Sequence, residues 1–169
     1  MTSALSSTST TPIGPFTVIA TASEIPVVLA SGWTADPVDL LRTIAPTLRP
    51  LTMRTVRRID GVTDAVAAYH EGELGRIGDV AVQQLSGDFL QHAWGILRGV
   101  PAGRPVTYTQ LAVLAGRPAA IRAAAAACAR NAVALFVPCH RVLRADGSLG
   151  GFRWGLPAKR WLLDHERAA

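Results

Sequence analysis

Apolar and polar residues alternate along the first half of the chain, and Gly and Pro interrupt the alternation. The pattern is clearest at residues 13–31, which read IGPFTVIATASEIPVVLAS. A period of two is typical of β-strands and Gly and Pro mark turns, so this stretch predicts a β-hairpin or a short meander. Helical spacing follows over residues 37–44 and 62–69. We therefore predict a small α/β domain with an antiparallel sheet over residues 11–85.

The segment before this domain is dominated by Ser and Thr. Chain ends fray unless neighbouring structure holds them, so we expect residues 1–10 to form a disordered tail. The segment also lacks a basic region followed by an apolar core, and we do not expect it to be an export signal.

The apolar spacing becomes helical after residue 85, and we assign residues 86–169 to a second domain. Asp88 is a favourable residue to cap its first helix. Two shorter helices are predicted at residues 107–116 and 119–131, on either side of a tight Gly-Arg-Pro turn. Two short helices across a turn that contains Gly are typical of a helix-turn-helix, although many such pairs have no DNA partner. A last helix is predicted from the segment LPAKRWLLDHERA.

The two halves of the chain differ in net charge. Residues 1–85 hold six Arg and eight acidic residues, whereas residues 86–169 hold ten Arg, one Lys and four acidic residues. A basic half favours a polyanionic partner. The alternative is a basic surface that only serves solubility. Because the other half is mildly acidic, we favour a nucleic-acid surface.

Arg122 and Arg130 are separated almost entirely by Ala in the second helix of the pair. Base edges are read by hydrogen-bonding side chains, which Ala lacks. One interpretation is a well-packed helix, since Ala has the highest helix propensity. The other is a smooth helix that enters a narrow groove without sequence choice, with Arg122 as a wedge where a nucleotide is expelled.

A Cys, a His and an Arg follow one another in the segment FVPCHRV at residues 136–142. The apolar run before them predicts a strand that ends at Pro138, which has no amide hydrogen to donate. Cys139 would then lie at a strand end. A thiol reacts once its pKa falls, and both His140 and Arg141 favour a thiolate, by direct contact or through a water. A buried structural thiol is the alternative.

A histidine base needs a group that orients it. The last helix supplies three candidates, Asp164, His165 and Glu166.

Cys128, the second cysteine, fits packing inside the Ala-rich helix. Two cysteines and four scattered histidines show no zinc-ligand spacing, so we expect no metal. Two cysteines also make no disulfide framework, which favours a reducing cytoplasm.

The segment PCHRV at 138–142 resembles the active-site signature of the O6-alkylguanine-DNA alkyltransferases. The resemblance extends to FLQHAW, VTYTQLA, IRAAAAACARN, GFRWG and KRWLLDHE, and so covers the second half almost throughout. GFRWG and ACARN look closest to the alkyltransferase half of the bacterial adaptive-response protein. The first half matches weakly, chiefly in PIGPFTVIA. The family implies a small RNase H-like α/β domain followed by a mostly helical, winged helix-turn-helix-like domain.

The resemblance also implies a role for each matching residue. Cys139 would accept a methyl or small alkyl group from O6 of guanine, and also from O4 of thymine, in a single irreversible turnover. His140 would act as the base through a water, oriented by Glu166. Tyr108 would help to rotate the target nucleotide and donate a proton to the base. Arg122 would fill the vacated place in the stack. The remaining roles are the turn brace Asn131, the pocket lysine Lys159, the DNA contacts Ala123, Ala126 and Arg130, and the pocket residues Pro138, Phe152, Arg153 and Trp154.

The implied partner is double-stranded DNA, bound by a monomer through the minor groove without sequence specificity. No cofactor and no membrane are expected.

Phe152 stands where many members of the family have Tyr, and Arg153 and Trp154 replace small residues of other members. Three alternatives remain at this point: a DNA-binding regulatory or lesion-signalling module, a lesion binder without transfer, and a thiol hydrolase that turns over repeatedly.

Overall fold

A computed structural model describes residues 2–169, and its contacts divide the chain into two compact units. The first unit comprises the residues up to Leu85 together with Ala132–Phe136. The second comprises Ser86–Asn131 and Val137–Ala169. The sequence-based assignment of all residues after 85 to one domain is therefore wrong for Ala132–Phe136. Within residues 2–169, no helix is both long and apolar enough to span a lipid bilayer.

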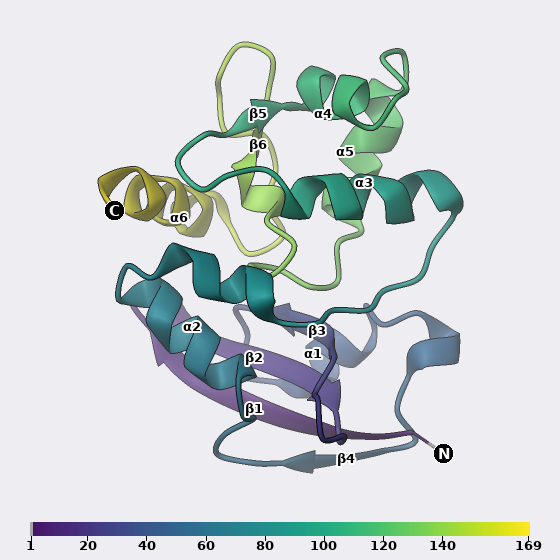
Figure 1. Ribbon diagram of the computed structural model, residues 1–169, viewed down its shortest axis with the longest axis vertical. Helices are drawn as coiled ribbons and strands as arrows, with labels where there is room; N and C mark the ends of the chain where they lie inside the picture. Colours follow the sequence, from purple (N-terminus) through teal and green to yellow (C-terminus); the bar gives the residue numbers. More distant parts are fainter. Residues whose placement is uncertain (1) are drawn as a thin grey trace. The chain divides into compact units, whose positions relative to one another are not determined.

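The first unit is built on a four-stranded mixed sheet in the order β3-β2-β1-β4 (Figure 1). Its strands are β1 (Ser3–Thr11), β2 (Gly14–Thr21), β3 (Val28–Gly32) and β4 (Thr52–Thr55). The β2-β3 pair is antiparallel, as predicted for residues 13–31. Strand β1 also pairs with β2 in an antiparallel manner, whereas β4 pairs with β1 in parallel. The helices of this unit are α1 (Pro37–Leu41) and α2 (Val62–His70), with 3-10 turns η1 (Pro46–Leu48) and η2 (Leu74–Asp79).

Strand β1 overturns the expected disordered tail over residues 3–10, and Met1 lies outside the described residues. It is an inner strand with partners on both sides, and the hydroxyls of Ser6, Ser7, Thr8 and Thr11 are hydrogen-bonded. The hydroxyl of Ser7 donates to the carbonyl of Arg57 at 3.0 Å, and the hydroxyls of Thr8 and Thr17 are 2.7 Å apart. Hydrogen bonds to two strands fix a segment whose own composition offers little hydrophobic burial.

Residues 132–136 pack against β3 within the first unit. The amide of Ser31 donates to the carbonyl of Ala132 at 2.9 Å, and its hydroxyl donates to the carbonyl of Ala134 at 2.7 Å. The predicted strand over 132–138 is wrong, because only Val133 forms an isolated bridge and Leu135 has a φ of 74°. A left-handed residue cannot continue a pleated strand, so the apolar run is a buried turn.

The second unit is mostly helical, as predicted. It holds α3 (Asp88–Arg98), α4 (Tyr108–Leu114), α5 (Ile121–Ala129) and α6 (Leu156–Ala168). The short strands β5 (Val106–Thr107) and β6 (Val142–Leu143) pair in parallel, and the 3-10 turn η3 (Cys139–Arg141) precedes β6. In α3 the cap position is Gly87, and Asp88 stands in the first turn, where a carboxylate suits the helix dipole.

Helices α3, α4 and α5 pack around a small apolar core. The indole nitrogen of Trp94 donates a 2.8 Å hydrogen bond to the carbonyl of Ala127, which fixes α3 against α5. Thr107 caps α4 through a reciprocal pair of hydrogen bonds with Gln110, so the predicted start of this helix is confirmed. Buried side chains of these three helices are Ala93, Leu97, Leu111, Ala112, Ala124 and Ala127.

Candidate active site

The turn η3 presents three buried residues, Cys139, His140 and Arg141, in direct succession. Cys139 does not follow a strand, contrary to the sequence-based expectation. The side-chain amide of Asn131 instead holds the turn by donating a 2.7 Å hydrogen bond to the carbonyl of Val137. Asn131 thus connects the end of α5 to the residues just before the cysteine.

His140 and Glu166 form a buried pair. The Nε2 of His140 lies 2.7 Å from Oε1 of Glu166, and the two side chains are 0% and 1% exposed. An ionised carboxylate only accepts hydrogen bonds, so Nε2 carries the proton. The other ring nitrogen, Nδ1, is buried and has no hydrogen-bond partner among residues 2–169. His140 is therefore arranged to accept a proton at Nδ1. Of the three candidates on the last helix, Glu166 is the one that orients the histidine.

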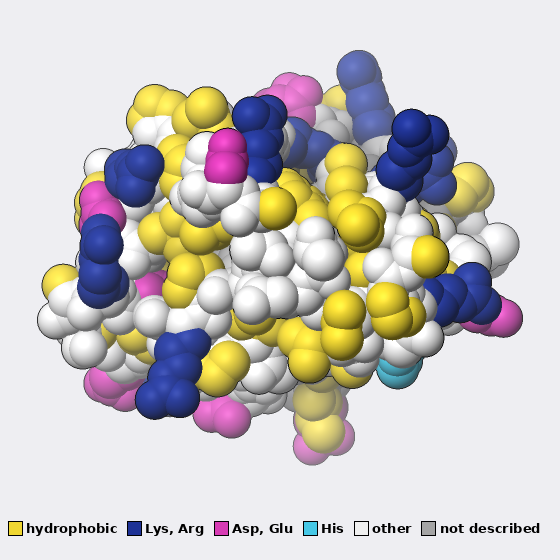
Figure 2. All heavy atoms as spheres, turned by 90° about the horizontal axis from the view of Figure 1, so that it is seen from above, with side chains coloured by type: hydrophobic (Ala, Val, Ile, Leu, Met, Phe, Trp, Pro, Cys, Tyr) yellow, Lys and Arg dark blue, Asp and Glu magenta, His cyan; other side chains and the backbone are white. Residues whose placement is uncertain are grey.

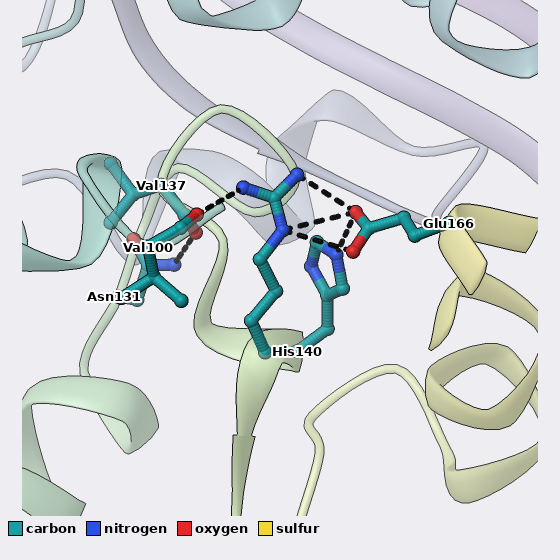
Figure 3. A network of polar contacts seen from close by, with 6 residues as sticks. Val100, Asn131, Val137, His140 and Glu166 are labelled. Atoms are coloured by element: carbon teal, nitrogen blue, oxygen red, sulfur yellow. Dashed lines mark hydrogen bonds and ion pairs between the residues drawn. The ribbon is translucent and has the colours of Figure 1, made fainter. Parts of the chain in front are cut away.

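Arg141 binds the same carboxylate of Glu166, which Figure 3 shows beside His140. Its Nε donates to both oxygens of Glu166 at 3.1 and 3.0 Å, and one terminal nitrogen donates to Oε1 at 2.8 Å. The other terminal nitrogen donates to the carbonyl of Val100 at 2.8 Å. We expected Arg141 to favour a thiolate at Cys139, but its guanidinium binds Glu166 instead. The spacing of these residues along the chain did not indicate this contact.

The ionisation of this group follows from burial and pairing. Burial raises the pKa of Glu166, but the hydrogen bonds and charges of His140 and Arg141 outweigh it and lower that pKa to about 2. Burial lowers the pKa of His140, and the charges of Arg141 and Lys159 act in the same direction against the opposing influence of Glu166. At neutral pH the site therefore pairs an ionised glutamate with a neutral histidine.

Cys139 is held as a neutral thiol in the resting protein. Burial raises its pKa, while a hydrogen bond from Asn131 and the positive charges of Lys159 and Arg153 act in the opposite direction. Lys159 is fully buried, and its Nζ donates to the carbonyl of Val142 at 2.7 Å and to that of Gly151 at 3.4 Å. The thiol therefore needs a base before it can act as a nucleophile.

A cavity of about 230 Å³ opens beside Cys139. It brings together most of the predicted pocket, although Pro138 is not among the described residues that line it. Cys128, which we expected to serve packing, also lines the cavity and is partly exposed. Burial raises the pKa of the Cys128 thiol strongly. The lining residues are Tyr108, Ala125, Cys128, Ala129, Asn131, Cys139, Gly151, Phe152, Arg153 and Trp154.

Residues 151–154 shape one wall of this cavity, and Gly150 directly precedes them. Gly150 has a φ of +68°, and a Cβ there would lie 3.0 Å from the hydroxyl of Tyr108. A glycine is therefore required for the close approach of the tyrosine. Arg153 donates a 2.8 Å hydrogen bond to the carbonyl of Ala129, and its guanidinium lies 6.0 Å from the ring centre of Trp154. The wall is thus connected to the end of α5.

The helix pair α4 and α5 places the residues expected to contact DNA. Arg122 and Arg130 are exposed near the two ends of α5, and Ala123 and Ala126 are half-buried. Figure 2 shows a face whose centre is hydrophobic and uncharged, with Lys and Arg side chains and several Asp and Glu side chains around its edge. The exposed Arg122 and Arg130 provide the positive charge that a polyanion would contact.

Two residues that the sequence suggested do not belong to the site. Asp164 pairs with Arg167 on the exposed side of α6, and the ring of His165 stacks on Trp161 at 4.6 Å. Among residues 2–169, no three His, Cys, Asp or Glu side chains are grouped so that they could hold a metal ion.

The sequence and the fold both have known relatives. The family model described as 6-O-methylguanine DNA methyltransferase, DNA binding domain, matches residues 88–168. The bifunctional transcriptional activator/DNA repair enzyme Ada of Escherichia coli (strain K12) is 51% identical over 78 residues, which are 46% of this chain and 22% of Ada. The methylated-DNA–protein-cysteine methyltransferase of Salmonella typhimurium is 40% identical over 106 residues, which are 63% of this chain and 62% of that relative.

Solved structures extend the similarity to both units. A crystal structure of a variant of the Mycobacterium tuberculosis O6-methylguanine methyltransferase is 30% identical, with a TM-score of 0.75, and the match covers 98% of this chain and 93% of that one. A structure of Mycobacterium tuberculosis OGT in complex with DNA is 29% identical, with a TM-score of 0.75 over 97% and 93% of the two chains. This chain belongs to the O6-methylguanine-DNA methyltransferase family. It spans less than two thirds of the length of the two curated relatives named above.

Proposed function

We propose that this protein repairs alkylated DNA by moving a methyl or small alkyl group from O6 of guanine, and also from O4 of thymine, to the sulfur of Cys139. One observation carries the proposal: the thiol of Cys139 lines a cavity and directly precedes a histidine that is paired with a buried glutamate. A buried thiol next to such a pair is arranged to lose its proton on demand.

The transfer balances as a displacement at carbon. His140 takes the thiol proton at Nδ1 through a water, and Glu166 stabilises the imidazolium that forms. The thiolate attacks the alkyl carbon, a carbon–sulfur bond forms, and the carbon–oxygen bond breaks with its electron pair moving to the base. Tyr108 donates a proton to the guanine ring, and the proton taken up by His140 is lost to solvent as the Tyr108 phenolate is reprotonated from solvent. The products are unmodified guanine and an S-alkylcysteine. Since nothing in this site would reverse a thioether, each molecule acts once, and the acceptor is the protein itself rather than a cofactor.

Several residues position these groups. Asn131 braces the turn and contributes a hydrogen bond that lowers the pKa of Cys139. The charge of Lys159 lowers that pKa further. Phe152, Arg153 and Trp154 enclose the base, and Phe152 stacks on it without the hydroxyl that a tyrosine would add.

DNA binding is assigned to the α4–α5 pair. The small side chains Ala123 and Ala126 allow α5 to enter the minor groove closely, and Arg130 contacts the backbone. Arg122 takes the place of the nucleotide that is rotated into the cavity. Contacts of this kind are not sequence-specific, so affinity should depend on salt far more than on sequence. We expect a monomer that acts in the cytoplasm.

The test follows a labelled methyl group. The protein is incubated with duplex DNA that contains O6-methylguanine carrying a radioactive methyl group. We expect one label per molecule on Cys139, no transfer in Cys139→Ala, and transfer in the control Cys128→Ala. Release of label over many turnovers would indicate a hydrolase, and binding without transfer would indicate a regulatory or lesion-signalling module. Either outcome would overturn the proposal.

A further inference from the structure

Three ionisable side chains share one buried space in the second unit. The side chains of His140, Arg141 and Glu166 are 0%, 7% and 1% exposed. Oε1 of Glu166 accepts hydrogen bonds from both of the other two, and both could serve as its counterion. Which of them carries the balancing positive charge decides whether the histidine is still able to accept a proton.

The geometry answers this question in favour of Arg141. Its guanidinium binds both oxygens of Glu166 and is held from the far side by the carbonyl of Val100 at 2.8 Å. A guanidinium stays charged at any pH of interest. One buried negative charge is therefore already balanced by one buried positive charge, and a second proton on His140 would leave a net charge among buried side chains, which is costly.

We propose that Arg141 is the positioning residue that balances Glu166 and thereby leaves His140 uncharged and able to act as the base. This role is additional to the orientation of His140 by Glu166. The protonation of His140 can be measured without alkyl transfer, whereas the test on transfer rates rests on the proposed function. Without the guanidinium, the carboxylate would take its positive charge from His140. The imidazole would then be protonated before the substrate arrives and could not accept the proton of Cys139.

Other charged or titratable groups also influence His140. Lys159, on α6, carries a positive charge that lowers the pKa of His140, while Glu166 raises it. Cys139, on the same turn, becomes negative once its proton has left. That thiolate compensates the imidazolium formed during transfer, so the charge separation is transient. Lys159 remains in every variant below, and the comparison therefore isolates Arg141.

The direct test measures the protonation of His140 by nitrogen-15 NMR of its ring, without any DNA. In the wild-type protein we expect a neutral ring at pH 7 with the proton on Nε2. In Arg141→Met we expect an imidazolium at pH 7, with the pKa of His140 raised by about one to three units, the range over which an adjacent charge acts. Arg141→Lys keeps the charge and should keep the ring neutral. Arg141→Gln, which can still donate to the carbonyl of Val100, serves if Arg141→Met does not fold.

The second test follows the rate of alkyl transfer against pH. In Arg141→Met the acid limb of the profile should move upward by the same one to three units. The double variant Arg141→Met with Glu166→Gln removes both charges, so its acid limb should return close to that of the wild type although its plateau stays low. If Arg141 only stabilised the fold, Arg141→Met would lower the maximal transfer rate and leave the acid limb of the pH profile at its wild-type position.

Three results would overturn the proposal: an imidazolium at pH 7 in the wild-type protein, a neutral ring in Arg141→Met or Arg141→Gln, or an unmoved acid limb. Failure of the proposed function gives a different result, because no alkyl group would then reach Cys139 in the wild type at any pH. The NMR measurement stays valid in that case.

Discussion

The side-chain amide of Asn131 donates a 2.7 Å hydrogen bond to the carbonyl oxygen of Val137, and both residues are buried. This bond connects the last residue before the buried turn with the residue two positions before Cys139. A hydrogen bond from Asn131 also lowers the pKa of Cys139. The position and the acidity of the acceptor thus depend on one amide outside the PCHR segment.

Replacing this amide should cost both stability and rate. Asn131→Asp keeps the shape of the side chain but loses its donor and places a negative charge near the thiol. We expect a loss of about 1–3 kcal/mol in the free energy of unfolding, because the carbonyl of Val137 is left buried without its partner. Alkyl transfer should also slow, since the pKa of Cys139 rises. Urea unfolding and transfer rates check this, and a variant equal to wild type in both would contradict it.

The lowered pKa of Glu166 predicts how the free energy of unfolding depends on pH. Its pKa is lowered from 4.5 to about 2 in the folded protein. A depressed carboxylate pKa contributes stability that is fully present above the unfolded value and is lost as the pH falls towards the folded value. We therefore expect a loss on the order of 3 kcal/mol between pH 4.5 and 2 in the wild type. Glu166→Gln should lack this part of the dependence, and an equal slope in both proteins would refute the assignment.

The resting thiol of Cys139 should react slowly with small reagents. Burial raises its pKa, so little thiolate exists at neutral pH. In a Cys128→Ala background, iodoacetamide should modify Cys139 more slowly than free cysteine at neutral pH. The rate should continue to rise above the ordinary thiol pKa of about 8.5. Rapid modification that is already complete at neutral pH would show a stable thiolate instead.

Trp154 should limit the size of the alkyl group. Its ring lines the cavity of about 230 Å³ beside Cys139. Trp154→Gly should therefore be inactivated faster by benzylguanine than the wild type, with methyl transfer as the control for an intact acceptor. If benzylguanine inactivates both proteins at the same rate, the tryptophan does not narrow the pocket.

Loss of Arg122 should slow alkyl transfer from duplex DNA more than alkyl transfer from the free base. It is exposed near the start of α5. If it fills the place of a rotated nucleotide, Arg122→Ala should slow repair of duplex DNA and leave the reaction with free O6-methylguanine nearly unchanged. Arg57→Ala removes the same charge from an exposed position in the first unit and serves as the control. Equal losses on both substrates would argue against a wedge.

Local sequence signals determined much of the second unit. The Thr107 cap, the apolar spacing of α3 and the segment of α6 predict their elements because caps and helical periodicity act over a few residues. The same holds for Cys139, His140 and Glu166 as candidates, since their residue types limit the chemistry. The resemblance to a known family then connected these candidates to one reaction.

Tertiary structure decided what local patterns could not. Residues 3–10 and 132–138 were wrongly predicted. Pairing with β2 and β4 orders a Ser- and Thr-rich strand, and docking on β3 turns an apolar run into a buried turn. The place of Arg141 was decided in the same way. Its sequence neighbours suggested a contact with the thiol, whereas folding brings Glu166 and Val100 to it from distant segments. Electrostatic balance in a buried site depends on distances in space, which sequence spacing does not encode.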